Sequence, residues 1–338
     1  MRPGGNRSLV LVDDTLTELL TPLHEFPGAT LMILGAARCG TSSLHELLGL
    51  HPGVCASVPK EPFFFEDEAE YRKGEDYYRR SYFPHWSGQR VVVEGRIANM
   101  VLPYVAPRIK ATFPDARFIV ALREPAERAF SHWALKHRLS LEPLGFDDAI
   151  ARTRRRLGAG NPLEGPDAER LWRAGIRRNP PHVAYDVYVE AGQYAHHLRR
   201  FFALFPRNRF FILALEEIRR DPSGSARRLF EFAGLDPAQG PARVGHSNAW
   251  TMTGPRLLHR MDHAVHLHKL LPMVWRSRLR RWTSVLQRRR YVPAAETMLW
   301  LREYYAPLDR ELCELLGWQE CPWQRPADPD TAAKGEGA

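Results

Sequence analysis

Four short apolar runs recur along the chain, and each is followed by a polar turn or by a segment with helical periodicity. Apolar runs of this length are typical of strands that are buried on both faces of a parallel sheet. Strands alternating with helices predict a three-layer α/β fold around a central parallel sheet. The predicted strands are residues 31–35, 90–94, 117–122 and 210–215.

Helix signals follow the first and third of these runs. Residues 41–48 begin with three hydroxyl side chains and place Leu44, Leu47 and Leu48 on one face, and the His-Pro-Gly sequence at 51–53 ends the pattern. Residues 126–137 form a second predicted helix, with Pro125 near its first position. An acidic helix start, Glu216-Glu217, follows the fourth run as well, so the chain passes from strand into helix at three of the predicted strands.

Most of the chain is predicted to form one domain, residues 29–325. A short helical lead-in is expected at residues 1–28 and a flexible tail at 326–338. Residues 140–185 have the glycines, prolines and arginine run of an insertion over the sheet. Residues 256–290 form a basic segment, discussed below.

The turn after the first predicted strand has the composition of an anion site. Residues 35–43 read Gly-Ala-Ala-Arg-Cys-Gly-Thr-Ser-Ser, so two glycines bracket a tight turn that leads into a helix. The free backbone N–H groups and the positive end of a helix dipole favour bound phosphate or sulfate. Hydroxyls at residues 41–43 can donate to the same oxygens. The alternative is a glycine turn that only connects a strand to a helix.

The spacing of Gly35 and Gly40 matches a nucleotide-binding P-loop, but one feature differs. A P-loop has a lysine directly after its second glycine, whereas this chain has Thr41 there and a cation earlier, at Arg38. A phosphosulfate carries less charge than magnesium–ATP, so amides, hydroxyls and one loop cation suffice to hold it. A P-loop-type nucleotide-dependent kinase remains the alternative enzyme.

A second group of polar residues follows the third predicted strand. Arg123 stands at the C-terminal end of that strand, where α/β sheets place ligand-binding groups, and Ser131 lies about two helical turns further on. We expect Arg123 and Ser131 to converge on one phosphate, and Arg128 to be a helix-surface or sheet-packing cation. A strand-end arginine in a simple salt bridge is the alternative.

These motifs together resemble a known family. Their order is similar to that of the sulfotransferases typified by the heparan sulfate N- and O-sulfotransferase domains, and the resemblance covers roughly residues 30–325. The residues that carry it are Gly35-x-x-Arg38-x-Gly40-Thr-Ser-Ser-Leu44, Lys60-Glu61-Pro-Phe-Phe-Phe65, Arg123-Glu-Pro-x-x-Arg128-x-x-Ser131, Gly192-x-Tyr194 and Tyr304-x-x-Leu308.

The resemblance implies an enzyme that moves a sulfuryl group from 3′-phosphoadenosine 5′-phosphosulfate to a hydroxyl or amine, without a metal. It implies that Arg38, Cys39, Gly40, Thr41, Ser42 and Ser43 hold the 5′-phosphosulfate and that Arg123 and Ser131 hold the 3′-phosphate. Glu61 matches the family's catalytic base, with Arg38 stabilising charge. The residues agree, because an acid beside an apolar cluster can be partly desolvated and poised for proton abstraction. A surface acid paired with Lys60 is the alternative.

The chain departs from the family's pattern after the second predicted strand. Animal members have an acid–lysine pair followed by Ser or Thr, and that lysine supports the leaving group. Here Glu94-Gly95-Arg96 stands instead. Arg96 is the candidate to replace the lysine, and the alternative is that the lysine's role is unfilled. Glu94 is the second candidate for the base, since it ends a predicted strand on the same edge of the sheet.

The net charge of +9 is concentrated in one stretch. Residues 256–290 hold ten Lys or Arg and one acid, Asp262, which gives 10 − 1 = +9 and leaves the remainder near neutral. This argues against a global nucleic-acid-binding surface. The basic segment predicts contact with an acidic acceptor, the donor's rim or a membrane surface; a solvated helix face and a non-enzymatic polyanion-binding protein are the alternatives. Four histidines at 259–268 lack further ligands for a metal site.

Compartment and acceptor are less constrained. The four cysteines are too few and too scattered for a disulfide scaffold or a zinc knuckle, so a reduced compartment is the simpler interpretation. No secretion signal or membrane span is evident, and we expect a cytoplasmic protein. The acceptor is left open among carbohydrates, glycolipids and secondary metabolites.

Overall fold

The computed structural model describes residues 26–27, 31–138, 141–158, 170, 187–241 and 291–324. Its centre is a five-stranded sheet with the strand order β2-β3-β1-β4-β5, in which all neighbouring strands run parallel. The strands are β1 (Leu31–Gly35), β2 (Val54–Ala56), β3 (Val91–Glu94), β4 (Arg117–Leu122) and β5 (Phe210–Ala214). The central parallel sheet of the predicted α/β fold is confirmed.

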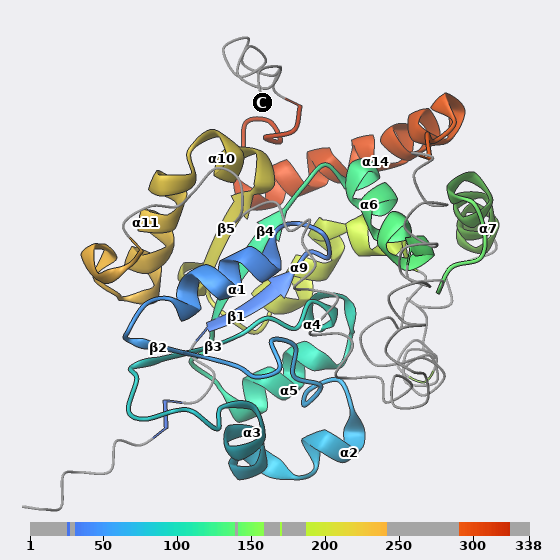
Figure 1. Ribbon diagram of the computed structural model, residues 1–338. Coiled ribbons are helices and arrows are strands. Elements are labelled where there is room, and N and C mark those ends of the chain that lie inside the picture. Colours follow the sequence, from blue (N-terminus) through green and yellow to red (C-terminus); the bar gives the residue numbers. More distant parts are fainter. Residues whose placement is uncertain are drawn as a thin grey trace, which may run out of the picture.

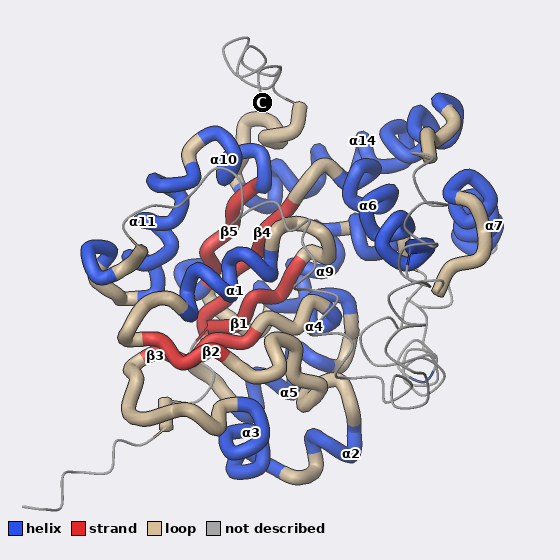
Figure 2. The backbone as a smooth tube through the Cα atoms, in the orientation of Figure 1, coloured by secondary structure: helices blue, strands red, loops and turns tan. Residues whose placement is uncertain are grey.

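Helices flank the sheet, and Figures 1 and 2 show α1 in front of β1 with α9 behind the strands. Neighbouring parallel strands need crossover connections, and helices in such connections cover the faces of the sheet. The helices are α1 (Thr41–Gly49), α2 (Glu68–Tyr71), α3 (Gly74–Tyr82), α4 (Ala98–Val101), α5 (Val105–Thr112), α6 (Pro125–Arg138), α7 (Phe146–Gly158), α9 (Tyr194–Phe202), α10 (Leu215–Arg220), α11 (Pro222–Ala233) and α14 (Ala295–Leu316), with 3-10 turns η2 (Glu190–Gly192), η3 (Arg207–Arg209) and η4 (Pro237–Gln239).

The core forms between these layers because the strands are apolar on both faces. Residues 31–34 of β1 are almost completely buried, as are residues 118–122 of β4. The ring of Phe118 packs edge-on against Phe201 and Phe205 at and just beyond α9, with centroids 5.5 and 4.7 Å away. Burying such aromatic rings contributes on the order of 2–3 kcal/mol each. The sheet is thereby a rigid platform for the loops at its C-terminal edge.

The structure contains features that the sequence analysis did not predict. The strand β2 was missed, since three residues are too few to show a periodicity, and α7 is a regular helix within the predicted insertion at 140–185. Cys313 and Cys321 form a disulfide with a Cα–Cα distance of 6.0 Å, a pairing that the scattered spacing did not lead us to expect. Three predicted segments lie outside the described residues: the lead-in at 1–28 except for residues 26–27, the basic segment at 256–290 and the tail at 326–338.

Candidate active site

The loop between β1 and α1 presents its backbone at the point where the strand order reverses. The chain continues from β1 toward β2 and β3 on one side, and β4 and β5 lie on the other. Such a switch point is where α/β sheets bind ligands. Gly40 has φ 84° and no side chain caps α1, so the first-turn N–H groups of this helix are left for another acceptor. The predicted anion site has the required backbone geometry.

Arg38 itself adopts a left-handed backbone conformation with φ 71°, and it is the one non-glycine residue with positive φ among those that the structure describes. A long side chain in this region costs on the order of 1 kcal/mol or more and is held only where the surroundings demand it. Its Nε donates a hydrogen bond of 3.0 Å to Ser131 Oγ, on α6. The loop and the second polar motif, 93 residues apart, are therefore in direct contact.

Arg123 takes a different partner from the one that we expected. Its guanidinium forms an ion pair of 2.5 Å with Glu127, one turn into α6, and no contact with Ser131 is found among the described residues. The hydroxyl of Tyr194 donates to the Arg123 carbonyl at 2.8 Å and so fixes the end of β4. The predicted convergence of Arg123 and Ser131 on one phosphate stays a prediction, with Arg38 now beside Ser131.

We call Arg38, Arg123, Arg128 and His132 the Arg38 cluster, since each influences the charge of another. Burial, together with Arg138 and Arg123, lowers the pKa of Arg38. Burial and then Arg128, Lys136 and Arg38 lower the pKa of His132 well below its usual range. Within the described ranges no carboxylate pairs with Arg38. The Nε atom of Arg123 and the Nδ1 atom of His132 are buried without hydrogen-bond partners. Positive charge and orphaned donors suit a bound anion.

Arg128 lies inside the protein, which rules out the helix-surface alternative. Its side chain is completely buried and donates through Nη2 to the Tyr188 carbonyl, while Nε and Nη1 have no hydrogen-bond partner. A buried cation with so few acceptors is costly unless an anion lies near. Arg128 thus adds positive charge behind the loop.

The remaining loop residues contribute in different ways. Burial raises the pKa of the Cys39 thiol to about 11, although Arg128 and Arg123 oppose the shift, so this side chain stays protonated, and the Cys39 backbone N–H donates to the Ala36 carbonyl at 3.2 Å. Thr41 and Ser43 are buried and Ser42 is half-buried. The Thr41 hydroxyl accepts a hydrogen bond of 3.4 Å from Lys60 Nζ, which connects the loop to the segment that carries Glu61.

Glu61 is held between two cations. Its Oε1 lies 3.0 Å from Lys60 Nζ and its Oε2 lies 3.0 Å from Arg96 Nη1, while 26% of the side chain stays exposed. Burial alone would raise the pKa of Glu61, but Lys60 and Arg96 together outweigh it and the pKa is lowered. The carboxylate is therefore ionised and accessible, as a general base must be, though its basicity is reduced while both cations remain in contact.

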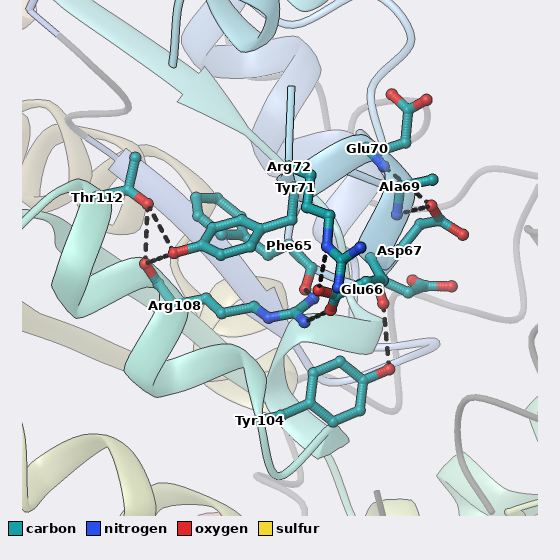
Figure 3. A network of polar contacts seen from close by, with 11 residues as sticks. Phe65, Glu66, Asp67, Ala69, Glu70, Tyr71, Arg72, Tyr104, Arg108 and Thr112 are labelled. Atoms are coloured by element: carbon teal, nitrogen blue, oxygen red, sulfur yellow. Dashed lines mark hydrogen bonds and ion pairs between the residues drawn. The ribbon is translucent and has the colours of Figure 1, made fainter. Parts of the chain in front are cut away.

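The chain that follows Glu61 is anchored to α5, as Figure 3 shows. The Tyr104 hydroxyl donates to the Glu66 carbonyl at 3.2 Å, and Arg108 Nη1 donates to the Phe65 carbonyl at 3.0 Å. Arg108 also forms an ion pair with Glu68 at the start of α2. Two main-chain carbonyls, of Phe65 and Glu66, and the Glu68 side chain are thus held in place, so the segment that carries Glu61 has a fixed support on its C-terminal side.

Glu94, the second candidate for the base, is enclosed. It is completely buried, and its two carboxylate oxygens accept from the Tyr78 hydroxyl at 2.7 Å and from Asn99 Nδ2 at 2.9 Å. Burial raises the pKa of Glu94 to about 7, with Tyr78, Arg96 and Asn99 opposing the shift. A side chain with no solvent contact and both oxygens occupied cannot reach an acceptor, which leaves Glu61 as the better candidate.

Residues 29–248 match the sulfotransferase domain family. The chain belongs to this sulfotransferase family. Its sheet carries the family's parallel α/β fold, and the predicted resemblance is confirmed.

Two of the relatives that the chain matches are named as heparan sulfate sulfotransferases. Human heparan sulfate glucosamine 3-O-sulfotransferase 6 is 32% identical over 213 residues, which cover 63% of this chain and 53% of that protein. Human bifunctional heparan sulfate N-deacetylase/N-sulfotransferase 2 is 26% identical over 61% of this chain and 22% of its own length. The match therefore spans about half of the first relative and about a fifth of the second.

A solved structure has the same fold. The sulfotransferase from Alicyclobacillus acidocaldarius superposes with a TM-score of 0.56 at 24% identity, covering 88% of this chain and 98% of that one.

Some site residues were not singled out beforehand. Lys60 was expected only as a motif member and as the partner of Glu61 in the alternative interpretation, and the link from Arg96 to Glu66 had no signal in the sequence. Within the described ranges there is no group of three metal-ligating side chains, and the histidines at 259–268 lie outside them. No helix in the described part of the chain is both long and apolar enough for a membrane crossing.

Proposed function

We propose that this sulfotransferase uses 3′-phosphoadenosine 5′-phosphosulfate as donor and transfers its sulfuryl group to a hydroxyl or amine of a carbohydrate acceptor. The observation that carries the proposal is the link from Thr41, at the N-terminus of α1, through the Lys60 ammonium to the partly exposed carboxylate of Glu61. Two hydrogen bonds thus join the anion site at the start of α1 to an accessible ionised base. The names of the two heparan sulfate relatives support a carbohydrate acceptor.

The residues divide the chemistry between them. Arg38, the backbone amides of residues 40–43 and the hydroxyls of Thr41 and Ser42 hold the 5′-phosphosulfate. Arg123 and Ser131 hold the 3′-phosphate. Glu61 takes the proton of the acceptor as the acceptor oxygen or nitrogen bonds to sulfur. The bond from sulfur to the bridging oxygen breaks, and 3′-phosphoadenosine 5′-phosphate leaves with that electron pair. The chemistry needs no metal ion.

The 3′-phosphate of the donor fits the Arg38 cluster. A 3′-phosphate supplies the acceptors that Arg123 Nε and its neighbours lack. The loop has no lysine after Gly40, so a magnesium–ATP kinase is the weaker alternative. A polyanion-binding protein that acts through residues 256–290 would not need an accessible base at Glu61.

Transfer of radiolabelled sulfuryl from the donor to a panel of acceptors tests the proposal directly. The panel contains desulfated heparan sulfate, a glycolipid and a phenol, and the Glu61→Gln variant is the matched control. The proposal predicts label on a carbohydrate with the parent and at most about a hundredth of that rate with the control. Absence of transfer to every acceptor, together with no binding of 3′-phosphoadenosine 5′-phosphate, would refute it. Label on the phenol or the glycolipid alone would correct the acceptor class.

A further inference from the structure

The side chain of Lys60 passes over Gly95, the residue that follows β3. A Cβ atom built on Gly95 would lie 2.9 Å from Lys60 Cε and 3.4 Å from Lys60 Cγ, which is closer than packed carbon atoms allow. The lysine therefore occupies the space that any side chain at position 95 would need. Glycine at this position is what lets Lys60 lie there.

The backbone of Lys60 is fixed from two sides. Its carbonyl accepts from Gly95 N at 2.9 Å and from Ser57 Oγ at 2.9 Å. Ser57 Oγ in turn lies 3.2 Å from His45 Nε2, which is on α1. The lysine side chain thus starts from a point tied both to the end of β3 and to the helix whose N-terminus forms the anion site. Only 18% of it is exposed, so its path is confined.

The ammonium group ends between the base and the loop. It donates to Glu61 Oε1 at 3.0 Å and to Thr41 Oγ1 at 3.4 Å. An ammonium has three donors, and among the described residues no acceptor for the third is found. Because Lys60 can only donate, the Thr41 oxygen accepts and the hydroxyl proton stays available for an anion above the helix.

Arg96 is placed differently. Its guanidinium is 3% exposed, donates to Glu61 and to the buried Glu66 at 3.0 and 2.6 Å, and lies 4.7 Å from the ring of Phe63. The planar guanidinium is held by two carboxylates and an aromatic ring, so it has little freedom to move toward charge that develops elsewhere during the reaction. Arg96 holds Glu61 in place, whereas the flexible ammonium of Lys60 can change partners.

We propose that Lys60 is the cation that stabilises the leaving oxygen during sulfuryl transfer, in the space that Gly95 leaves open. The inference rests on the proposed function and refines the same site. As the bond from sulfur to the bridging oxygen breaks, the electron pair stays on that oxygen and the Lys60 ammonium donates a hydrogen bond to it. Glu61 then keeps only Arg96 as a close cation, which strengthens it as a base when it takes the acceptor's proton.

Replacement and relocation of the lysine test this role. Lys60→Met removes the charge and keeps most of the volume, and we expect kcat to fall by about 10²–10³-fold. Adding Gly95→Lys to Lys60→Ala returns an ammonium to the emptied space from the end of the neighbouring parallel strand, β3. We expect this double variant to regain at least about tenfold in kcat over Lys60→Ala, which a merely structural lysine would not allow. Lys73→Met, at an exposed ion pair with Glu70, is the control and should keep parental turnover.

The pH profile gives a second readout. The charged groups that face Glu61 are Lys60 and Arg96, with Glu66 and Glu94 beyond them. Removing Lys60 takes away one of the two cations that favour the ionised carboxylate. The acid limb of kcat/KM should therefore move to higher pH in Lys60→Met and return toward the parental position in the double variant.

The outcomes separate the inference from the proposed function. If the parent neither transfers sulfuryl groups nor binds 3′-phosphoadenosine 5′-phosphate, the proposed function fails. If the parent is active and Lys60→Met keeps kcat within about threefold of it, the inference is wrong while the function stands. Loss of activity without recovery in the double variant and with an unmoved acid limb also overturns it. Thermal melting checks that each variant folds, and Lys60→Gln replaces Lys60→Met in the same comparisons if the latter does not.

Discussion

The two charged clusters at the edge of the sheet differ in how their cations are balanced. In the Arg38 cluster, one described carboxylate, Glu127, forms an ion pair, and it contacts Arg123 alone. In the group around Glu61, both Lys60 and Arg96 contact carboxylates. A cluster with more cations than paired acids is prepared for an anion from outside, whereas a neutralised cluster holds a carboxylate ionised and in position. The first is suited to binding and the second to chemistry.

The Glu61→Gln substitution should separate catalysis from donor binding most clearly. We expect kcat to fall by about 10²–10⁴-fold, because the amide keeps the shape but cannot accept a proton. The affinity for 3′-phosphoadenosine 5′-phosphate should stay nearly parental, since Glu61 has no bond to the Arg38 cluster in the described chain. Steady-state kinetics and calorimetry measure the two effects. Near-parental turnover would place the base elsewhere.

The opposite pattern is expected for Arg38→Ala. Loss of one charge-assisted hydrogen bond to the anion costs about 1.5–3 kcal/mol, so the affinity for 3′-phosphoadenosine 5′-phosphate should fall by roughly 10–200-fold. Relief of the left-handed backbone at this position does not oppose the loss, because alanine is unfavourable there too. Arg123→Ala should act in the same direction. Calorimetric titration decides, and parental affinity in either variant would remove that arginine from the phosphate site.

Glu94 provides a prediction on stability and pH. Its pKa in the folded protein is raised to about 7 from 4.5, so the folded state binds more protons than the unfolded state between these values. The free energy of unfolding should therefore decrease as pH rises from about 4.5 to 7, by roughly 3 kcal/mol from this group. Glu94→Gln mimics the neutral form and should flatten that decrease. Equal pH slopes of denaturant unfolding in the parent and the variant would contradict the assignment.

The smallest effect is expected at Cys39. Its thiol is buried, turned toward the Ala37 carbonyl at 3.7 Å and kept protonated. Cys39→Ala should change the affinity for 3′-phosphoadenosine 5′-phosphate by less than about threefold, which is below 1 kcal/mol. A larger loss of affinity in a folded variant would mean that the Cys39 side chain contributes to the anion site.

Much of the fold could be predicted from the sequence because it depends on local patterns. The run at residues 31–35 and the glycines around the loop indicated β1, the turn and α1 before any tertiary contact was known. The strand β2 gave no such signal, because its three residues are defined only by pairing with β3. The disulfide between Cys313 and Cys321 likewise depends on the turn after α14, which brings the two residues together.

In the candidate site, too, the residue types could be predicted from the sequence, but the contacts between them could not. The residue types at 38, 61, 123 and 131 indicated anion binding and a base, but which arginine contacts Ser131 depends on the backbone of Arg38 and could not be deduced from spacing. The position of Lys60 was also hidden, because it follows from the meeting of two loops. One signal was present in the sequence, namely a glycine where the family's lysine is expected, with another lysine elsewhere in the motif set.

The central claim is that the Arg38 cluster binds a donor with a 3′-phosphate and that this chain is not a magnesium–ATP enzyme. Calorimetric titration of the parent protein with 3′-phosphoadenosine 5′-phosphate and, separately, with ATP and magnesium tests it most directly. The account predicts micromolar or tighter binding of the first, about 8 kcal/mol or more, and at least about a hundredfold weaker binding of the second. Tight binding of ATP with magnesium and none of 3′-phosphoadenosine 5′-phosphate would contradict it.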